Sequence, residues 1–173
     1  IGSQPISGWE FTYDYRSSSG SVSLTSLLNM ALMSTATKIV ACSVMSPNLK
    51  VVMGSVEKSA FSGGRSSAGT QSFSIPLNCD AGTRINVTID ATPDSSAMPG
   101  VMALDSAGSA GVAKGVGIRI LQGAAPVTLG TPMAVGTATH DSAYYVPMQA
   151  QYYQTEPVIA PGEANGTATF TMT

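Results

Sequence analysis

The chain has 173 residues, a length that suits one domain with at most a short appendage. Only 10% of the residues are charged and the formal net charge is -2, so the composition excludes a basic nucleic-acid groove and a polybasic membrane patch. The hydrophobic fraction of 43% is enough for a core and excludes a disordered chain. Gly, Ser, Thr, Val and Ala dominate, which indicates short strands joined by turns whose weakly charged edges need some other protection against aggregation.

Apolar side chains occupy every second position in two runs within the first 41 residues. The first run is aromatic and comprises Trp9, Phe11, Tyr13 and Tyr15. The second run comprises Val22, Leu24, Leu28, Met30 and Leu32. A period of two predicts strands. The Leu, Met and Ala content of the second run also suits a helix, but the absence of helix caps favours a strand.

Further alternating runs follow at short intervals from residue 42 to the end of the chain. They predict strands at residues 49–53, 73–79, 85–89, 116–120, 127–129, 144–154 and 168–172. A Gly/Ser-rich loop is expected at 61–70 and a Pro/Gly loop at 156–165. Pro76 lies on the face opposite the apolar residues of its run, which suggests an edge strand or a bulge. Short strands separated by turns predict an all-β sandwich.

Two cysteines, Cys42 and Cys79, are present. The pair is compatible with one disulfide formed in an oxidising compartment and also with two buried thiols. No Cys-x-x-Cys motif or Cys/His cluster occurs, so we expect no zinc site. The chain begins at Ile1 rather than Met, from which we expect a processed or trimmed product without a remaining signal peptide.

The residues needed for catalysis do not form a recognisable set. His140 is the only histidine, and no Gly-x-Ser-x-Gly motif accompanies it, so we interpret His140-Asp141 as a polar turn. The glycine-rich stretch from Gly111 to Gly117 is not followed by a helix and therefore makes a poor phosphate site. We expect no enzyme activity, no catalytic residue, no metal and no cofactor.

From Cys42 to Thr173 the sequence resembles the pilin domain of bacterial chaperone–usher fimbriae. Several segments carry this resemblance in the family's order: Cys42-Ser-Val, Phe73-Ser-Ile-Pro-Leu-Asn-Cys79, the hairpin from Cys79 to Asp90, Gly115-Val-Gly-Ile-Arg-Ile120, Gln149–Thr155, Ala160–Asn165 and Ala168–Met172. The stretch from Cys42 to Thr173 covers about three quarters of the chain, and the order of the segments over this length makes the resemblance specific.

The resemblance implies an incomplete immunoglobulin-like sandwich that lacks its final strand and is completed by a donor strand. It also implies a disulfide between Cys42 and Cys79. The open groove would lie between the first and last strands, and its candidate lining residues are Leu49, Val51, Met53, Ala168, Phe170 and Met172. The alternative is an ordinary closed core made by the same residues. The implied partners are a periplasmic chaperone, the usher and a neighbouring pilus subunit, and the implied location is a fimbrium on the bacterial cell surface.

Residues 1–41 have two interpretations. They are the end of an N-terminal adhesin domain plus a linker, or an N-terminal donor-strand extension that uses the apolar run from Val22 to Leu32. We favour the first, which makes residues 42–173 the pilin domain of a tip adhesin that binds a host-surface glycan or protein through its N-terminal part. Trp9 and Tyr13 would then be core residues rather than sugar-stacking ones. The alternatives are a major or minor structural pilin and a self-contained Ig-like secreted binding module.

Overall fold

The computed structural model of the chain describes residues 16–17, 20–21 and 40–173. The chain divides into two compact units, Ile1–Ile39 and Val40–Thr173. In the first unit, β1 (Arg16–Ser17) pairs antiparallel with β2 (Gly20–Ser21). The aromatic run at residues 9–15 and the apolar run at 22–32 lie outside the described residues.

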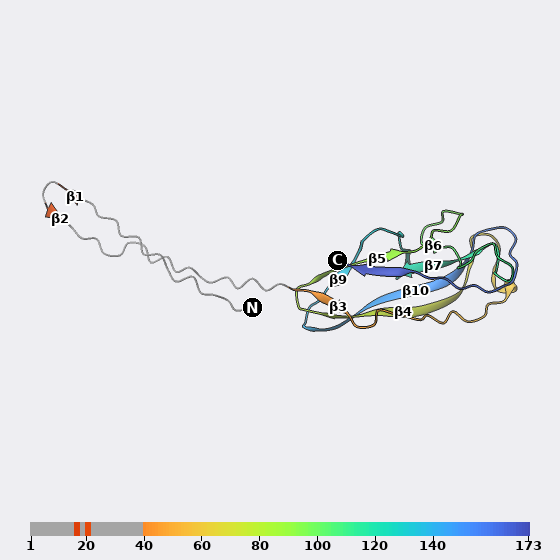
Figure 1. The fold of residues 1–173 in the computed structure, drawn as a ribbon, viewed down its shortest axis with the longest axis horizontal. Helices are drawn as coiled ribbons and strands as arrows, with labels where there is room; N and C mark the ends of the chain where they lie inside the picture. Colours follow the sequence, from red (N-terminus) through yellow and green to blue (C-terminus); the bar gives the residue numbers. More distant parts are fainter. Residues whose placement is uncertain (1–15, 18–19, 22–39) are drawn as a thin grey trace. The chain divides into compact units, whose positions relative to one another are not determined.

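The second unit consists of two antiparallel sheets (Figure 1). The larger sheet has the order β3-β4-β10-β7-β6, with β8 also paired to β7, and the smaller sheet has the order β11-β5-β9. The strands are β3 (Cys42–Val44), β4 (Ser67–Cys79), β5 (Arg84–Asp90), β6 (Val101–Met102), β7 (Val116–Gln122), β8 (Ala125–Pro126), β9 (Met133–Thr137), β10 (Ser142–Gln154) and β11 (Thr169–Met172). One turn of 3-10 helix, η1 (Lys58–Ala60), lies between β3 and β4.

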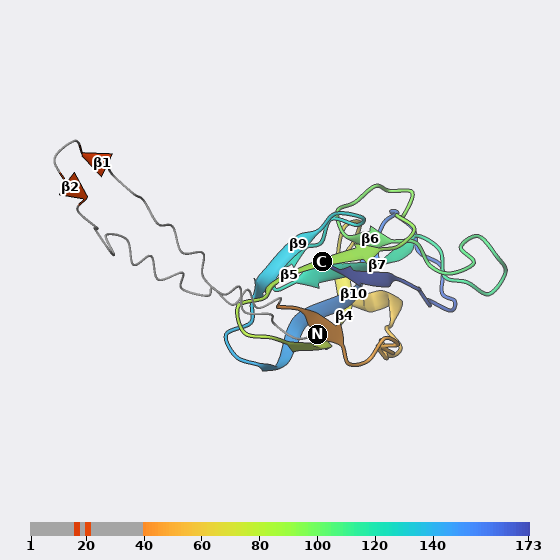
Figure 2. The ribbon, with the colours of Figure 1, turned by 60° about the vertical axis from the view of Figure 1, so that its left-hand side comes forward.

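The core lies between these two sheets, and Figure 2 shows β5 and β9 of the smaller sheet above β4 and β10 of the larger one. Strand β5 alternates cleanly, because Ile85, Val87 and Ile89 are buried and the side chains between them are less so. Buried residues of β4, β7 and β10 complete the core: Ile75, Leu77, Ile118, Ile120, Val146 and Met148. The all-β sandwich predicted from alternation is therefore confirmed. Within the described part of the chain no helix is long and apolar enough to cross a membrane.

Several strand boundaries differ from the sequence-based expectation. Strand β4 begins at Ser67, inside the expected Gly/Ser loop, because its first residues pair with the end of the long strand β10. Strand β9 was not predicted at all, and the expected strand at 127–129 is replaced by β8 just before it. The expected strand at 49–53 is absent, since that segment has no ladder partner among the described strands.

Pro76 was expected on an edge strand or at a bulge, but β4 lies between β3 and β10. The backbone N–H of Met45 donates to the carbonyl of Pro76, so the backbone of Pro76 faces β3. Proline has no N–H to return this bond. The ladder between β3 and β4 accordingly ends beside Pro76, and the pairing of Pro76 with Tyr145 of β10 is kept.

Candidate functional site

Strand β11 has one paired edge and one open edge among the described strands, because its sole strand partner there is β5. Just beyond β11, Thr173 and Asn86 exchange two backbone hydrogen bonds of 3.1 and 3.0 Å. Hydrogen-bonded and non-bonded pairs alternate along antiparallel strands. The backbone groups of Thr169 and Thr171 therefore face β5, and those of Phe170 and Met172 face the open edge.

The side chains of Phe170 and Met172 are half-buried and pack against the core, whereas those of Thr169 and Thr171 are exposed. The two apolar residues thus present a side chain to the interior and, among the described residues, an unpaired backbone to the open edge. This is the arrangement that an additional strand would complete. Ala168, the third residue expected here, lies before β11 and is exposed.

The candidate groove has two sides. The segment from residue 46 to residue 56 is called the first wall below, and β11 is called the second wall. Within the described part of the chain no backbone–backbone hydrogen bond involves residues 46–56. Val51 and Met53 are half-buried and pack against the same core as Phe170 and Met172. Leu49, by contrast, is exposed, with 36% of its surface accessible.

A disulfide fixes the strand that leads into the first wall. Cys42 and Cys79 are bonded, as the resemblance implied, and they face each other directly in the register of β3 and β4. In Figure 1, β3 and the C-terminal end of β11 lie at the same end of the unit. The start of the first wall and the end of the second wall are therefore close to one end of the sandwich.

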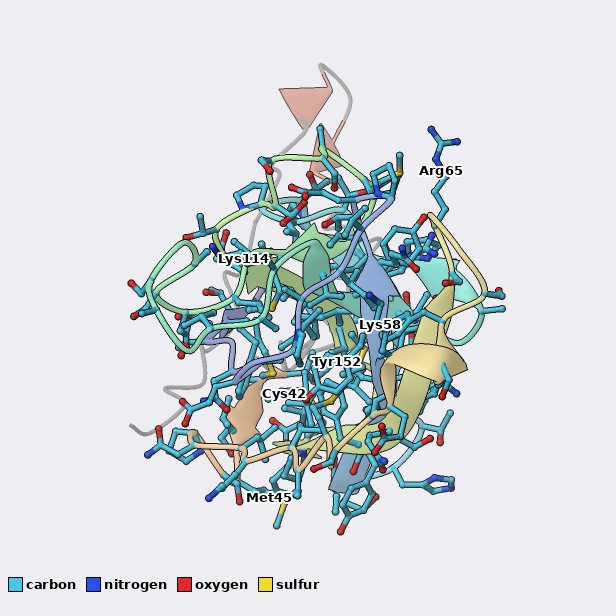
Figure 3. All side chains as sticks on the ribbon, turned by 90° about the vertical axis from the view of Figure 1, so that its right-hand side faces the viewer. Cys42, Met45, Lys58, Arg65, Lys114 and Tyr152 are labelled. Atoms are coloured by element: carbon cyan, nitrogen blue, oxygen red, sulfur yellow. A yellow bond between two sulfur atoms is a disulfide. The ribbon has the colours of Figure 1, made fainter. Side chains whose placement is uncertain are left out.

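A cavity of about 530 Å³ lies where the first wall ends and the approach to β11 begins. Its lining includes Gly54, Val56 and Phe61 on one side, Ile159 and Ala164 on the other, and Val116 and Tyr152 from the larger sheet. The hydroxyl of Tyr152 lies 3.4 Å from the carbonyl oxygen of Gly54 and 3.4 Å from that of Ala164. Figure 3 views this end of the unit, with Tyr152 and Lys58 near the middle and Met45 and Arg65 projecting outward.

Sequence reasoning missed most of the cavity residues. Tyr152 lies in the strand predicted at residues 144–154, but nothing in the alternation of that strand indicates the two carbonyl oxygens near its hydroxyl. Val56 and Ile159 lie in segments without periodicity, so no sequence signal identifies them. His140 is exposed, and its Nδ1 lies 2.8 Å from Thr139 Oγ1, consistent with a polar turn.

A two-sheet sandwich of this kind, with a last strand open on one edge, is the incomplete immunoglobulin-like fold of the pilin class. The family model for fimbrial proteins matches residues 30–173, which is most of the chain. The chain therefore belongs to the fimbrial protein family, whose members are exported to the bacterial cell surface.

Two relatives and one solved structure resemble about two thirds to three quarters of the chain. A fimbria adhesin protein of Klebsiella pneumoniae is 27% identical over 144 residues, covering 77% of this chain and 44% of the relative. Protein FhaE of Bordetella pertussis is 28% identical over 123 residues, covering 68% of this chain and 33% of the relative. The crystal structure of the CupB6 tip adhesin from Pseudomonas aeruginosa superposes with a TM-score of 0.65 at 26% identity, covering 76% of this chain and 38% of that one. The chain thus spans less than half of the length of each of these proteins.

Proposed function

We propose that residues 42–173 are the pilin domain of a fimbrial tip adhesin, and that the space between the two walls accepts a β-strand from another polypeptide. One observation carries this proposal. Phe170 and Met172 combine half-buried apolar side chains with backbone groups that face an open edge. In the first wall, Val51 and Met53 are also half-buried and apolar, and among the described residues they make no backbone–backbone hydrogen bond.

An open apolar edge is unfavourable in water, and this explains why the domain requires a partner. Unpaired backbone groups along an apolar edge promote association with any available strand. An added strand pairs those groups through its own backbone and fills the apolar positions with alternate side chains. The weak surface charge of the chain is compatible with an edge that is covered in use.

The donor in this proposal is first a periplasmic chaperone and then a neighbouring pilus subunit, with the usher directing the exchange. The names of the relatives support a role in adhesion, because one is a fimbria adhesin and the CupB6 structure is a tip adhesin. Binding of a host-surface glycan or protein is assigned to the part of the protein on the N-terminal side of residue 42.

A second candidate is a structural pilin whose own N-terminal run serves as the donor for another copy. The alternation of Val22, Leu24, Leu28, Met30 and Leu32 favours it. In that case the partner of one chain is an identical chain, and the chain assembles with itself.

Peptide binding to the full chain tests both proposals. The acceptor carries Leu24→Asp and Leu28→Asp, so that it cannot act as a donor. The probes are a peptide of residues 22–32 and a peptide of the same length that alternates Val and Thr. Both proposals expect the melting temperature to rise with the alternating peptide. The structural-pilin proposal also expects a rise with the 22–32 peptide, and the tip-adhesin proposal expects none. An acceptor that melts at the same temperature with and without either peptide contradicts strand uptake.

A further inference from the structure

The first wall is held to the rest of the domain by very few polar contacts. Among the described residues its backbone makes one hydrogen bond, in which the Tyr152 hydroxyl donates to the carbonyl of Gly54 over 3.4 Å. Otherwise it is held by side-chain packing, mainly that of Val51, Met53 and Val56.

The approach to the second wall is bonded much more extensively. Ala113 donates to the carbonyl of Glu163 over 2.9 Å, and Lys114 and Ala160 exchange two backbone hydrogen bonds of 3.1 Å. Asp105 accepts two further hydrogen bonds from Thr167 immediately before β11. The two sides of the candidate groove therefore differ. The approach to the second wall is hydrogen-bonded to neighbouring loops, whereas the backbone of the first wall makes one hydrogen bond among the described residues.

The fold places Tyr152 at this attachment through a local irregularity in β4. The register between β10 and β4 shifts between Ala150 and Tyr152, which is a β-bulge. On the bulged side Gly69 has a φ of +66°, and a methyl group added there would lie 2.5 Å from Val56 and 3.4 Å from the Tyr152 ring. Glycine at this position leaves space for the ring of Tyr152 and for Val56 of the first wall.

The Tyr152 hydroxyl can donate a hydrogen bond to either of two backbone carbonyls. It lies 3.4 Å from the carbonyl oxygens of both Gly54 and Ala164, but it has one hydrogen to donate. The hydroxyl keeps this hydrogen at neutral pH, because a tyrosine loses its proton only near pH 10 and burial raises the pKa of Tyr152 further. When it bonds to one carbonyl, the other remains open to a donor from an added strand.

We infer that Tyr152 is a positioning residue of the groove, whose hydroxyl tethers the first wall opposite the approach to β11 while the groove is unfilled. This inference rests on the proposed function, because the tether affects strand uptake only in a groove that accepts a strand. A wall that is already in place does not have to be ordered when a strand arrives, so the tether favours capture. Once a strand is bound, backbone pairing holds the wall and the tether matters less.

Tyr152→Phe removes the hydroxyl and keeps the ring. Tyr144→Phe is the matched control, because Tyr144 also lies on β10 and its hydroxyl donates to the carbonyl of Val135 over 3.0 Å, away from the first wall. Both changes are made in the full chain with Leu24→Asp and Leu28→Asp. The first measurement is the backbone NMR order parameter of residues 46–56 without any peptide.

We expect the order parameters of residues 46–56 to fall from about 0.85, which is typical of rigid backbone, to below about 0.6 in Tyr152→Phe and to stay unchanged in Tyr144→Phe. Equal order parameters in Tyr152→Phe and the parent, or the same fall in both variants, overturn the inference. The second measurement is the rate of binding of the alternating Val/Thr peptide, for which association should slow about fivefold, the size that one weak hydrogen bond provides, and dissociation should stay the same. A parent protein that binds no peptide contradicts the proposed function, whereas the order parameters still decide whether the tether exists.

Discussion

Asp105 holds Thr167 through both of its carboxylate oxygens. The backbone N–H of Thr167 donates to Oδ1 over 3.1 Å and its hydroxyl donates to Oδ2 over 2.9 Å. The N–H of Asp105 in turn donates to the carbonyl of Asn165 over 2.8 Å. These bonds fix the chain directly before β11 and so set where the open edge of that strand begins.

Asp105→Ala is therefore expected to loosen the approach to β11. The loss of two hydrogen bonds at an exposed site should lower the free energy of unfolding by about 1 kcal/mol. Urea denaturation measures this change, and exchange of the Thr167 amide should rise with it. Glu163→Ala is the control, because Glu163 is also an exposed carboxylate close to the same loop. A loss of equal size in both variants contradicts a specific role for Asp105.

Neighbouring residues of β11 should differ in their effect on strand uptake. Phe170→Asp places a charge among half-buried apolar side chains and should weaken binding of the alternating Val/Thr peptide at least about tenfold. Thr171→Asp adds the same charge to an exposed side chain on the opposite face and should leave binding close to that of the parent. Peptide titration followed by fluorescence anisotropy compares the two, and similar affinities would argue against a groove on the Phe170 side of the strand.

Loss of the disulfide should destabilise the domain strongly. Cys42 and Cys79 are 37 positions apart, and closing a loop of that length stabilises the folded state by about 4 kcal/mol on the chain-entropy estimate. The double variant Cys42→Ser/Cys79→Ser should lose about this amount in urea denaturation. The reduced parent protein should unfold at the same urea concentration as the double variant. A difference of less than about 1 kcal/mol between the oxidised and reduced parent contradicts the expectation.

Alanine substitutions at two glycines with similar backbone conformations distinguish the effect of backbone strain from that of a steric contact. Gly69 has a φ of +66° and Gly123 a φ of +60°, but only Gly69 has neighbours within 4 Å of an added methyl group. Gly123→Ala should cost about 1 kcal/mol through backbone strain alone. Gly69→Ala should cost clearly more, because Val56 must move, and it should also reduce peptide binding. Equal losses of stability in the two variants would show that Val56 adapts freely.

The sequence predicted those parts of the fold in which one face of a strand is buried. Ile85, Val87 and Ile89 alternate because the core lies on one side of β5, and the long strand β10 was recognised in the same way. The disulfide followed from the order of the segments that resemble pilins. These features depend on local pattern or on family order, so they are visible before the structure.

Other parts depended on tertiary contacts that no local pattern records. The apolar alternation of Leu49, Val51 and Met53 predicted a strand, yet the segment has no ladder partner among the described residues. Its alternation indicates a segment with one apolar face, and it does not indicate backbone pairing with another strand. The tether from Tyr152 to Gly54 joins residues that are far apart in the chain, and neither residue type alone indicates it. The proposed donor residues from Val22 to Leu32 remain a prediction, because they lie outside the described residues.

Amide exchange along β11 tests the central claim most directly. The protein is the full chain with Leu24→Asp and Leu28→Asp, and the amides are those of Phe170, Thr171 and Met172, measured by NMR before and after addition of the alternating Val/Thr peptide. The amide of Thr171 should be protected from the start, because it faces β5, while those of Phe170 and Met172 should exchange quickly and become protected when the peptide binds. Protection of Phe170 and Met172 equal to that of Thr171 before any peptide is added would contradict an open edge.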